Sequence, residues 1–173
     1  DYDPAWEDFL DQIDFNNTNT FEMFLKGGFS TLELAELGKP VTEDHDGPQG
    51  LALTGEGGGL DACAYCSEVV VASTYNTELA YEYGTAIGEE ALNIGVNGWY
   101  GPAANLHRSP LNGRNFEYYS EDPVLTGKIA AKVVSGAEQK GLVVYLKHFG
   151  WHTYEGVCTS LTAWCTEQAY SET

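Results

Sequence analysis

Basic residues are scarce in this chain. Its 173 residues include 8 Lys and Arg against 26 Asp and Glu, so the formal net charge is −18. A surface with that charge repels phosphate backbones and anionic lipids, which makes nucleic acid and membranes poor partners. No apolar run approaches the roughly 20 residues that a membrane-spanning helix needs. Neutral or cationic ligands suit such a surface better.

The first residue is not methionine, and the opening residues do not have the pattern expected of a leader. The chain opens with the acidic stretch DYDPAWEDFL, whereas a secretory signal has a basic segment followed by an apolar one. We therefore expect a piece of a longer protein whose targeting signal lay elsewhere. The residues leave the compartment open, as that of a soluble protein either cytoplasmic or secreted.

The four cysteines do not have the spacing of a zinc site. Cys63 and Cys66 form a C-x-x-C pair, but Cys158 and Cys165 are seven residues apart, and no histidine pair at ligand spacing completes a set. Unpaired thiols are the preferred interpretation. A Cys-based metal or redox protein is the least favoured alternative function, and we predict no metal and no cofactor.

Helical and strand patterns alternate along the chain. Most of the first forty residues have helical signals, including a Ser30–Glu33 capping box ahead of LAEL. Strand-like runs alternating with amphipathic helices indicate a parallel sheet with right-handed crossovers. Strands are predicted at 40–44, 68–73, 96–100 and 142–149, and helices at 77–94, 124–140 and 160–172.

These strands are too few for a closed barrel. A (β/α)8 barrel has eight strands and about 250 residues. We predict an α/β fold, a partial (β/α)8 TIM-type barrel of roughly the first half, with 1–29 as a helical lead-in and 30–173 as the incomplete barrel. A doubly wound nucleotide-binding sheet is disfavoured because GEGGG at 55–59 lacks the spacing of a phosphate loop. Half a barrel exposes edge strands, which predicts poor solubility or association.

Polar residues gather directly after the predicted strands, in DHDGPQG, GPAANLHRSPLNGRNFE and KHFGWHTYE. In a barrel these loops share the face where active sites are built. Asp46, Arg114, Lys147 and His148 would converge there. A carboxylate accepts hydrogen bonds from vicinal hydroxyls and the cations donate to others, so the set suits a sugar. The aromatic residues that would stack on a sugar ring are Tyr100, Tyr118, Tyr119 and Trp151.

Each candidate also has a structural interpretation. Asp46 would cap the turn at residues 47–48, and His148 alone would be a satisfied core histidine. A purely structural role explains Lys147 less well. The lysine stands at the end of an apolar strand, where burying its ammonium without a partner costs much free energy.

Arg114 would equally be an ion-pair partner of Glu117 or Asp122. Glu117 and Glu121 are four residues apart, and like charges that close destabilise each other. We therefore interpret these carboxylates as partners that hold the loop, and not as a catalytic acid/base pair.

Taken together, DHDGPQG, GVNGWYGPAANLHRSPLNGRNFEYYSEDP and GLVVYLKHF resemble the N-terminal domain of glycoside hydrolase family 3, the β-glucosidase-like retaining enzymes. The resemblance runs from about residue 30 to the end. It implies the first half of a (β/α)8 barrel and sugar-holding roles for four residues. Asp46 matches the aspartate of the Asp-Gly-Pro motif, Arg114 the arginine of Gly-Arg-Asn, and Lys147 and His148 the Lys-His pair.

The resemblance also shows what these 173 residues do not contain. The family nucleophile is an aspartate in a Ser/Thr-Asp-Trp-like motif, and the acid/base glutamate usually lies in a second domain. After Lys-His-Phe, His152 stands where the family commonly has Asn, Glu155 matches the family Glu, and Cys158 occupies an arginine position. Arg108, Trp151 and Glu155 are secondary candidates for substrate contact.

We therefore expect a fragment of a retaining β-glycosidase that hydrolyses terminal β-linked sugars. The isolated chain is expected to be inactive, since the catalytic carboxylates lie outside it. Expected partners are a β-linked oligosaccharide or an aryl or alkyl β-glycoside, together with the remainder of the barrel and the second domain. A non-catalytic carbohydrate-binding module is the main alternative, and the sugar, gluco, xylo or another, is left open.

Overall fold

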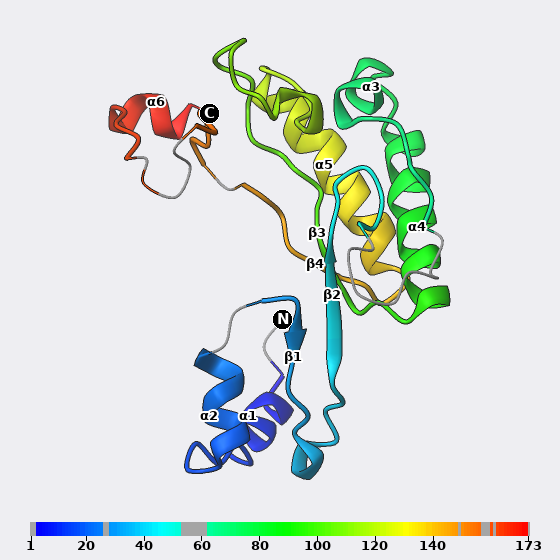
Figure 1. The fold of residues 1–173 in the computed structure, drawn as a ribbon, viewed down its shortest axis with the longest axis vertical. Coiled ribbons are helices and arrows are strands. Elements are labelled where there is room, and N and C mark those ends of the chain that lie inside the picture. Colours follow the sequence, from blue (N-terminus) through cyan, green and yellow to red (C-terminus); the bar gives the residue numbers. More distant parts are fainter. Residues whose placement is uncertain are drawn as a thin grey trace. The chain divides into compact units, whose positions relative to one another are not determined.

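A computed structural model describes residues 3–25, 28–52, 62–148, 150–156, 160 and 162–172 (Figure 1). Cys158 and the glycines at 55–59 lie outside these described residues. The chain divides into two compact units, Asp1–Asp44 and His45–Thr173, which are considered separately below.

The first unit contains two short helices and an antiparallel strand pair. The strands β1 and β2 pair with Ser30 opposite Glu43, so the capping box predicted at Ser30 is wrong. Ser30 is extended because its backbone pairs with β2, and only a 3-10 turn forms from LAEL. The elements are α1 (Ala5–Leu10), α2 (Thr18–Leu25), β1 (Ser30–Thr31), η1 (Ala35–Leu37) and the start of β2 (Thr42–Asp46).

The second unit contains the strand–helix–strand alternation. The strands β3 and β4 pair in parallel, with Gly98 opposite Val143 and Trp99 opposite Val144, and α5 connects them. This confirms the predicted parallel pairing. The elements are α3 (Glu68–Ser73), α4 (Thr77–Ile94), β3 (Gly98–Tyr100), η2 (Asn115–Glu117), α5 (Pro123–Glu138), β4 (Val143–Val144) and α6 (Glu167–Ser171).

The ends of the two long helices follow local chemistry. The Asn76 side chain accepts hydrogen bonds from the N–H groups of Glu78 and Leu79, both at 3.0 Å, and so caps α4. Gly95 ends that helix with a φ of 82°, a left-handed conformation that glycine adopts without strain. Asp122 caps α5 in the same way as Asn76 caps α4. Both helices therefore lie close to their predicted ranges.

The main core lies between α4, α5 and the parallel strands (Figure 1). The two helices approach closely where Gly84 and Gly136 face the backbone of the opposite helix. Trp99 is fully buried, and its indole N–H donates to the Gly47 carbonyl at 2.7 Å. This bond ties β3 to the turn that follows β2.

Two strand predictions need correction. Residues 68–73 form the helix α3, in which Val71 is buried and Val70 is 51% exposed. Periodicity cannot separate a strand from a helix in so short an apolar run, and packing beside α4 and α5 selects the helix. The second prediction is a buried strand over 142–149, but among residues 142–148, which the structure describes, only Val143–Val144 is regular strand, and Val143 is 53% exposed.

Candidate functional site

Asp46 and Lys147 meet where β2 and β4 end. Asp46 is the last residue of β2, and Lys147 pairs with Ala103 in a parallel bridge just beyond β3 and β4. The Lys147 ammonium contacts the Asp46 carboxylate at 2.5 Å. The same carboxylate oxygen accepts the Gly47 N–H at 2.7 Å. Two residues about a hundred positions apart are thus brought together, as the position of each after a strand predicts.

Charge keeps Asp46 ionised. Burial raises the pKa of its carboxyl, but the hydrogen bonds from Lys147 and Gly47 and the positive charges of Lys147 and Arg114 outweigh burial. The pKa therefore lies below its ordinary value. The predicted turn contact is therefore observed at this residue, and the sugar-binding role of Asp46 stays a prediction.

Arg114 comes from the long loop after β3 and stands directly before η2. Its guanidinium pairs with Glu117, whose other oxygen lies 3.9 Å from the Lys147 ammonium. A second guanidinium nitrogen lies 3.7 Å from Glu155. Glu117 is buried between the two cations, so it holds them apart in fixed positions. Of the two partners left open by the sequence, Glu117 is the one observed.

His148 is a neutral ring within this cluster. Burial, followed by the charges of Arg114, Lys147 and His152, lowers its pKa to about 4. Its Nδ1 lies 2.9 Å from the Tyr118 hydroxyl, and its ring stacks on that of His152 with centroids 4.6 Å apart.

His152 stands where the resemblance noted above implies an asparagine. Its Nε2 is hydrogen-bonded to Glu155, and its main chain exchanges two hydrogen bonds with the Asn105 side chain, at 2.8 and 2.9 Å. The pair of His152 and Glu155 lies beside Arg114 through the Glu155 contact. The imidazole of His152 therefore lies at the edge of the cluster, stacked on that of His148.

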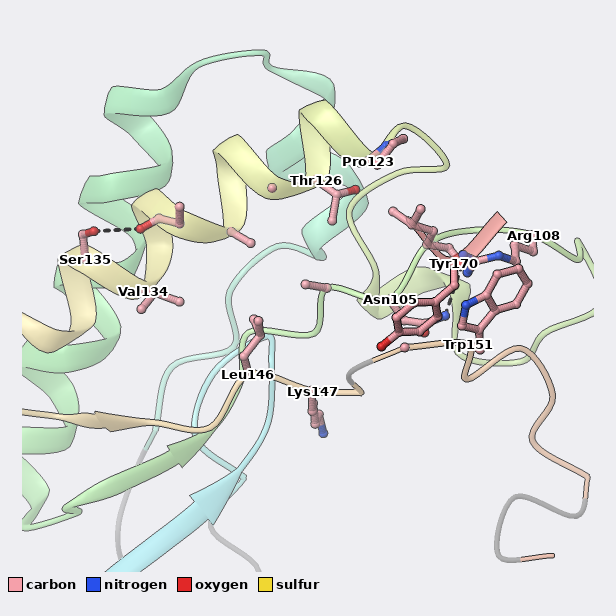
Figure 2. Close-up of a pocket in the computed structure, with 16 residues that line it drawn as sticks. Asn105, Arg108, Pro123, Thr126, Val134, Ser135, Leu146, Lys147, Trp151 and Tyr170 are labelled. Carbon is pink, nitrogen blue, oxygen red and sulfur yellow. Dashed lines mark hydrogen bonds between the residues drawn. The ribbon is translucent and has the colours of Figure 1, made fainter. Parts of the chain in front are cut away.

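Arg108 and Trp151 are also brought together, on the wall of a separate cavity. The Arg108 guanidinium carbon lies 3.9 Å from the centroid of the Trp151 ring, a cation–π contact. The cavity, of about 590 Å³, runs between α5 and the segments around residues 104–108 and 146–151. Figure 2 shows Leu146 pointing toward α5 and Lys147 pointing the other way.

One residue of the site was missed by sequence reasoning. Glu68 begins α3 and is completely buried, and its Oε1 accepts the Ala103 N–H at 2.8 Å. Because 68–73 resembled a strand, nothing indicated that this carboxyl would lie under the loop after β3. Only an acidic residue opening an apolar run could have signalled it.

The groups of the cluster are suited to bind a polar, uncharged ligand. It offers one ionised carboxylate, a guanidinium, an ammonium and a neutral imidazole.

Within the described ranges, no three His, Cys, Asp or Glu side chains are grouped to hold a metal ion. No helix in the described part of the chain is long and apolar enough to cross a membrane.

Comparison with known proteins identifies the class. The model of the Glycosyl hydrolase family 3 N terminal domain matches residues 31–168, and the chain belongs to this family. Beta-glucosidase A of Butyrivibrio fibrisolvens is 41% identical over 139 residues, which are 80% of this chain and 17% of that protein. Probable beta-glucosidase K of Aspergillus fumigatus is 34% identical over 173 residues, 98% of this chain and 23% of that protein.

Solved structures agree. Beta-glucosidase 3B from Thermotoga neapolitana, in complex with glucose, has a TM-score of 0.68 and 41% identity, covering 73% of this chain and 18% of that one. Beta-glucosidase from Kluyveromyces marxianus, also in complex with glucose, has a TM-score of 0.77 and 29% identity, covering 86% and 18%. The predicted fold class, a partial TIM-type barrel, is confirmed. The chain spans about a fifth of the length of these relatives.

Proposed function

We propose that this chain forms the sugar-holding wall of a retaining β-glucosidase and binds the non-reducing terminal sugar of a β-linked substrate. The observation that carries the proposal is the cluster of Asp46, Lys147, Glu117 and Arg114 at the carboxyl ends of the strands. Similarity to proteins named beta-glucosidase, two of them solved with glucose, supports it.

Each group has a distinct part in holding a sugar. The Asp46 carboxylate accepts from two adjacent hydroxyls, because both oxygens of an ionised carboxyl are acceptors. Arg114 and Lys147 donate to other hydroxyls from positions fixed by Glu117. When Tyr118 donates to Nδ1 of His148, the neutral ring carries its proton on Nε2 and donates from there. Ion pairs hold the set in position before the sugar arrives, which lowers the entropic cost of binding.

Of the secondary candidates, Glu155 belongs to the cluster, whereas Arg108 and Trp151 line the adjacent cavity. Glu155 orients Arg114, and Trp151 under Arg108 offers an aromatic face to the group bonded to the terminal sugar. The proposed reaction is a double displacement, in which a nucleophile and an acid/base about 5–5.5 Å apart are supplied from outside these residues. We propose no hydrolysis by the chain alone.

Glucose titration tests the binding role. Intrinsic tryptophan fluorescence or calorimetry of the chain should show saturable glucose binding that Asp46→Ala weakens by about a hundredfold, as expected when two charge-assisted hydrogen bonds are lost. Asp8→Ala removes one exposed carboxylate from α1 and serves as the charge-matched control. Equal affinities for the two variants would reject the proposed role of Asp46.

A second assay addresses catalysis. An aryl β-glucoside should not be turned over by the purified chain, whereas the longer protein should hydrolyse it with retention of anomeric configuration. Binding without hydrolysis by the longer protein would instead identify a carbohydrate-binding module.

A further inference from the structure

Glu68 is a buried carboxyl group that makes none of the proposed contacts with the sugar. Its side chain is 0% exposed, and Oε1 accepts the Ala103 N–H at 2.8 Å. Among the described residues, Oε2 is buried and has no hydrogen-bond partner. A buried acid with one fixed contact and one unpaired oxygen costs stability, so it calls for a functional explanation.

Ala103 connects Glu68 to the sugar site. Ala103 and Lys147 form the parallel bridge beyond β3 and β4. The Lys147 N–H donates to Pro102 O at 3.1 Å, and the Ala104 N–H donates to Lys147 O at 2.6 Å. Residues 102 and 104 therefore bind the main chain of Lys147, and Glu68 binds residue 103 between them.

Burial favours the neutral form of Glu68. Burial raises the pKa of Glu68 to about 9, the Ala103 N–H lowers it, the charge of Glu117 raises it and that of Lys147 lowers it. Glu68 therefore carries its proton at neutral pH. An ionised Glu68 would add a third carboxylate around Lys147 and compete with Asp46 and Glu117 for one ammonium.

Three tyrosine hydroxyls also respond to the charge of Glu68. Tyr83 lies on α4, and Tyr118 and Tyr119 follow η2. Burial is the main cause that raises the pKa of all three hydroxyls above the ordinary value, and the charge of Glu68 contributes to each. These hydroxyls stay protonated over the range in which Glu68 ionises.

We propose that Glu68 is a positioning residue of the sugar site: through Ala103 it fixes the main chain of Lys147 and thereby holds the Lys147 ammonium on the Asp46 carboxylate. The relevance to sugar binding rests on the proposed function above. The coupling between Glu68 and the Asp46–Lys147 pair does not, and it can be measured without a sugar.

The test compares Glu68→Gln with Glu68→Leu in the full chain. Glutamine keeps an oxygen for the Ala103 N–H and is neutral at every pH, whereas leucine has similar volume and no acceptor. Carboxyl NMR titration of Asp46 is the first readout. Its pKa should stay low in Glu68→Gln and move up toward the ordinary value in Glu68→Leu. An unchanged Asp46 titration in folded Glu68→Leu would overturn the proposal.

Glucose affinity against pH is the second readout, and it needs only the glutamine variant. From pH 7 to about pH 10, affinity of the wild type should fall more steeply than that of Glu68→Gln, because only the wild type ionises at residue 68. Coincident profiles would overturn the proposal even if Glu68→Leu does not fold. At pH 7, folded Glu68→Leu should bind glucose about tenfold more weakly, as for one lost buried hydrogen bond.

The two readouts separate the proposals. If the wild type binds no glucose but the Asp46 titration responds as stated, the proposed function fails and the positioning role stands. If glucose binds and Asp46→Ala abolishes binding, while Glu68→Leu changes neither readout, the positioning role fails and the function stands.

Discussion

The close approach of α4 and α5 makes two glycines of one helix respond to alanine in opposite directions. A Cβ at Gly136 would lie 2.2 Å from the Tyr81 carbonyl oxygen and 2.8 Å from the Thr85 nitrogen. Both are backbone atoms of α4, which cannot rotate away as a side chain would. A Cβ at Gly127, also in α5, would have no heavy atom within 4 Å, so this position is the matched control.

The expected changes in the free energy of unfolding have opposite signs for the two variants. Gly136→Ala should lower the free energy of unfolding by about 2 kcal/mol, since inserted atoms in a packed core cost roughly 1–3 kcal/mol. Gly127→Ala should raise it by about 0.5–1 kcal/mol, because alanine is the better helix former and restricts the unfolded chain. The variants should thus differ by about 3 kcal/mol, or about 6–12 °C in Tm for a chain of this size.

Circular dichroism during thermal or urea unfolding measures the difference. The two variants and the wild type should be compared at one protein concentration, so that association does not contribute. If both alanines shift Tm in the same direction by similar amounts, the helices do not meet at Gly136 and the reasoning fails.

Three further outcomes are expected. Lys147→Met should raise the pKa of Asp46 toward or above its ordinary value, because burial then acts without the lysine hydrogen bond and charge; carboxyl NMR titration measures this, and an unmoved titration would contradict the pair. His148, with its pKa lowered to about 4, binds fewer protons folded than unfolded, so stability should fall as pH drops from about 6.5 to about 4. His148→Asn should flatten this part of the Tm–pH profile, and identical profiles would refute it. Asn76→Ala should cost about 1 kcal/mol through loss of the α4 cap, with Asn76→Asp as a near-neutral control; equal thermal shifts for the two would count against the cap.

The cluster also explains why scarce cations occur where they do. Arg114 and Lys147 are both partly shielded from solvent and share one buried carboxylate, Glu117. In an acidic chain, a lone guanidinium would pair with any neighbouring carboxylate, and that carboxylate would occupy the groups needed to bind a ligand. Here the partner is fixed by the loop, so the cations keep a defined position toward Asp46.

Local signals in the sequence determined much of this protein. Asn76 and Gly95 bound α4, and Asp122 bounds α5 at its start, because caps act on their own helix ends and need no distant partner. The motifs that contain Asp46, Arg114, Lys147 and His148 indicated the family and the convergence of these residues after the strands. That convergence follows from parallel topology, which an alternating pattern implies.

Tertiary structure alone decided the remainder. Residues 68–73 are apolar enough for either a strand or a helix, and packing beside α4 and α5 chose the helix. The sequence left both Glu117 and Asp122 as candidate ion-pair partners of Arg114. In the structure Asp122 caps α5, and Glu117 pairs with the guanidinium. Glu68 could not be placed from sequence at all, because its burial depends on contacts with Ala103, 35 positions away. Spacing along a chain reports on neighbours, whereas burial and ion pairing depend on segments that meet only in the folded state.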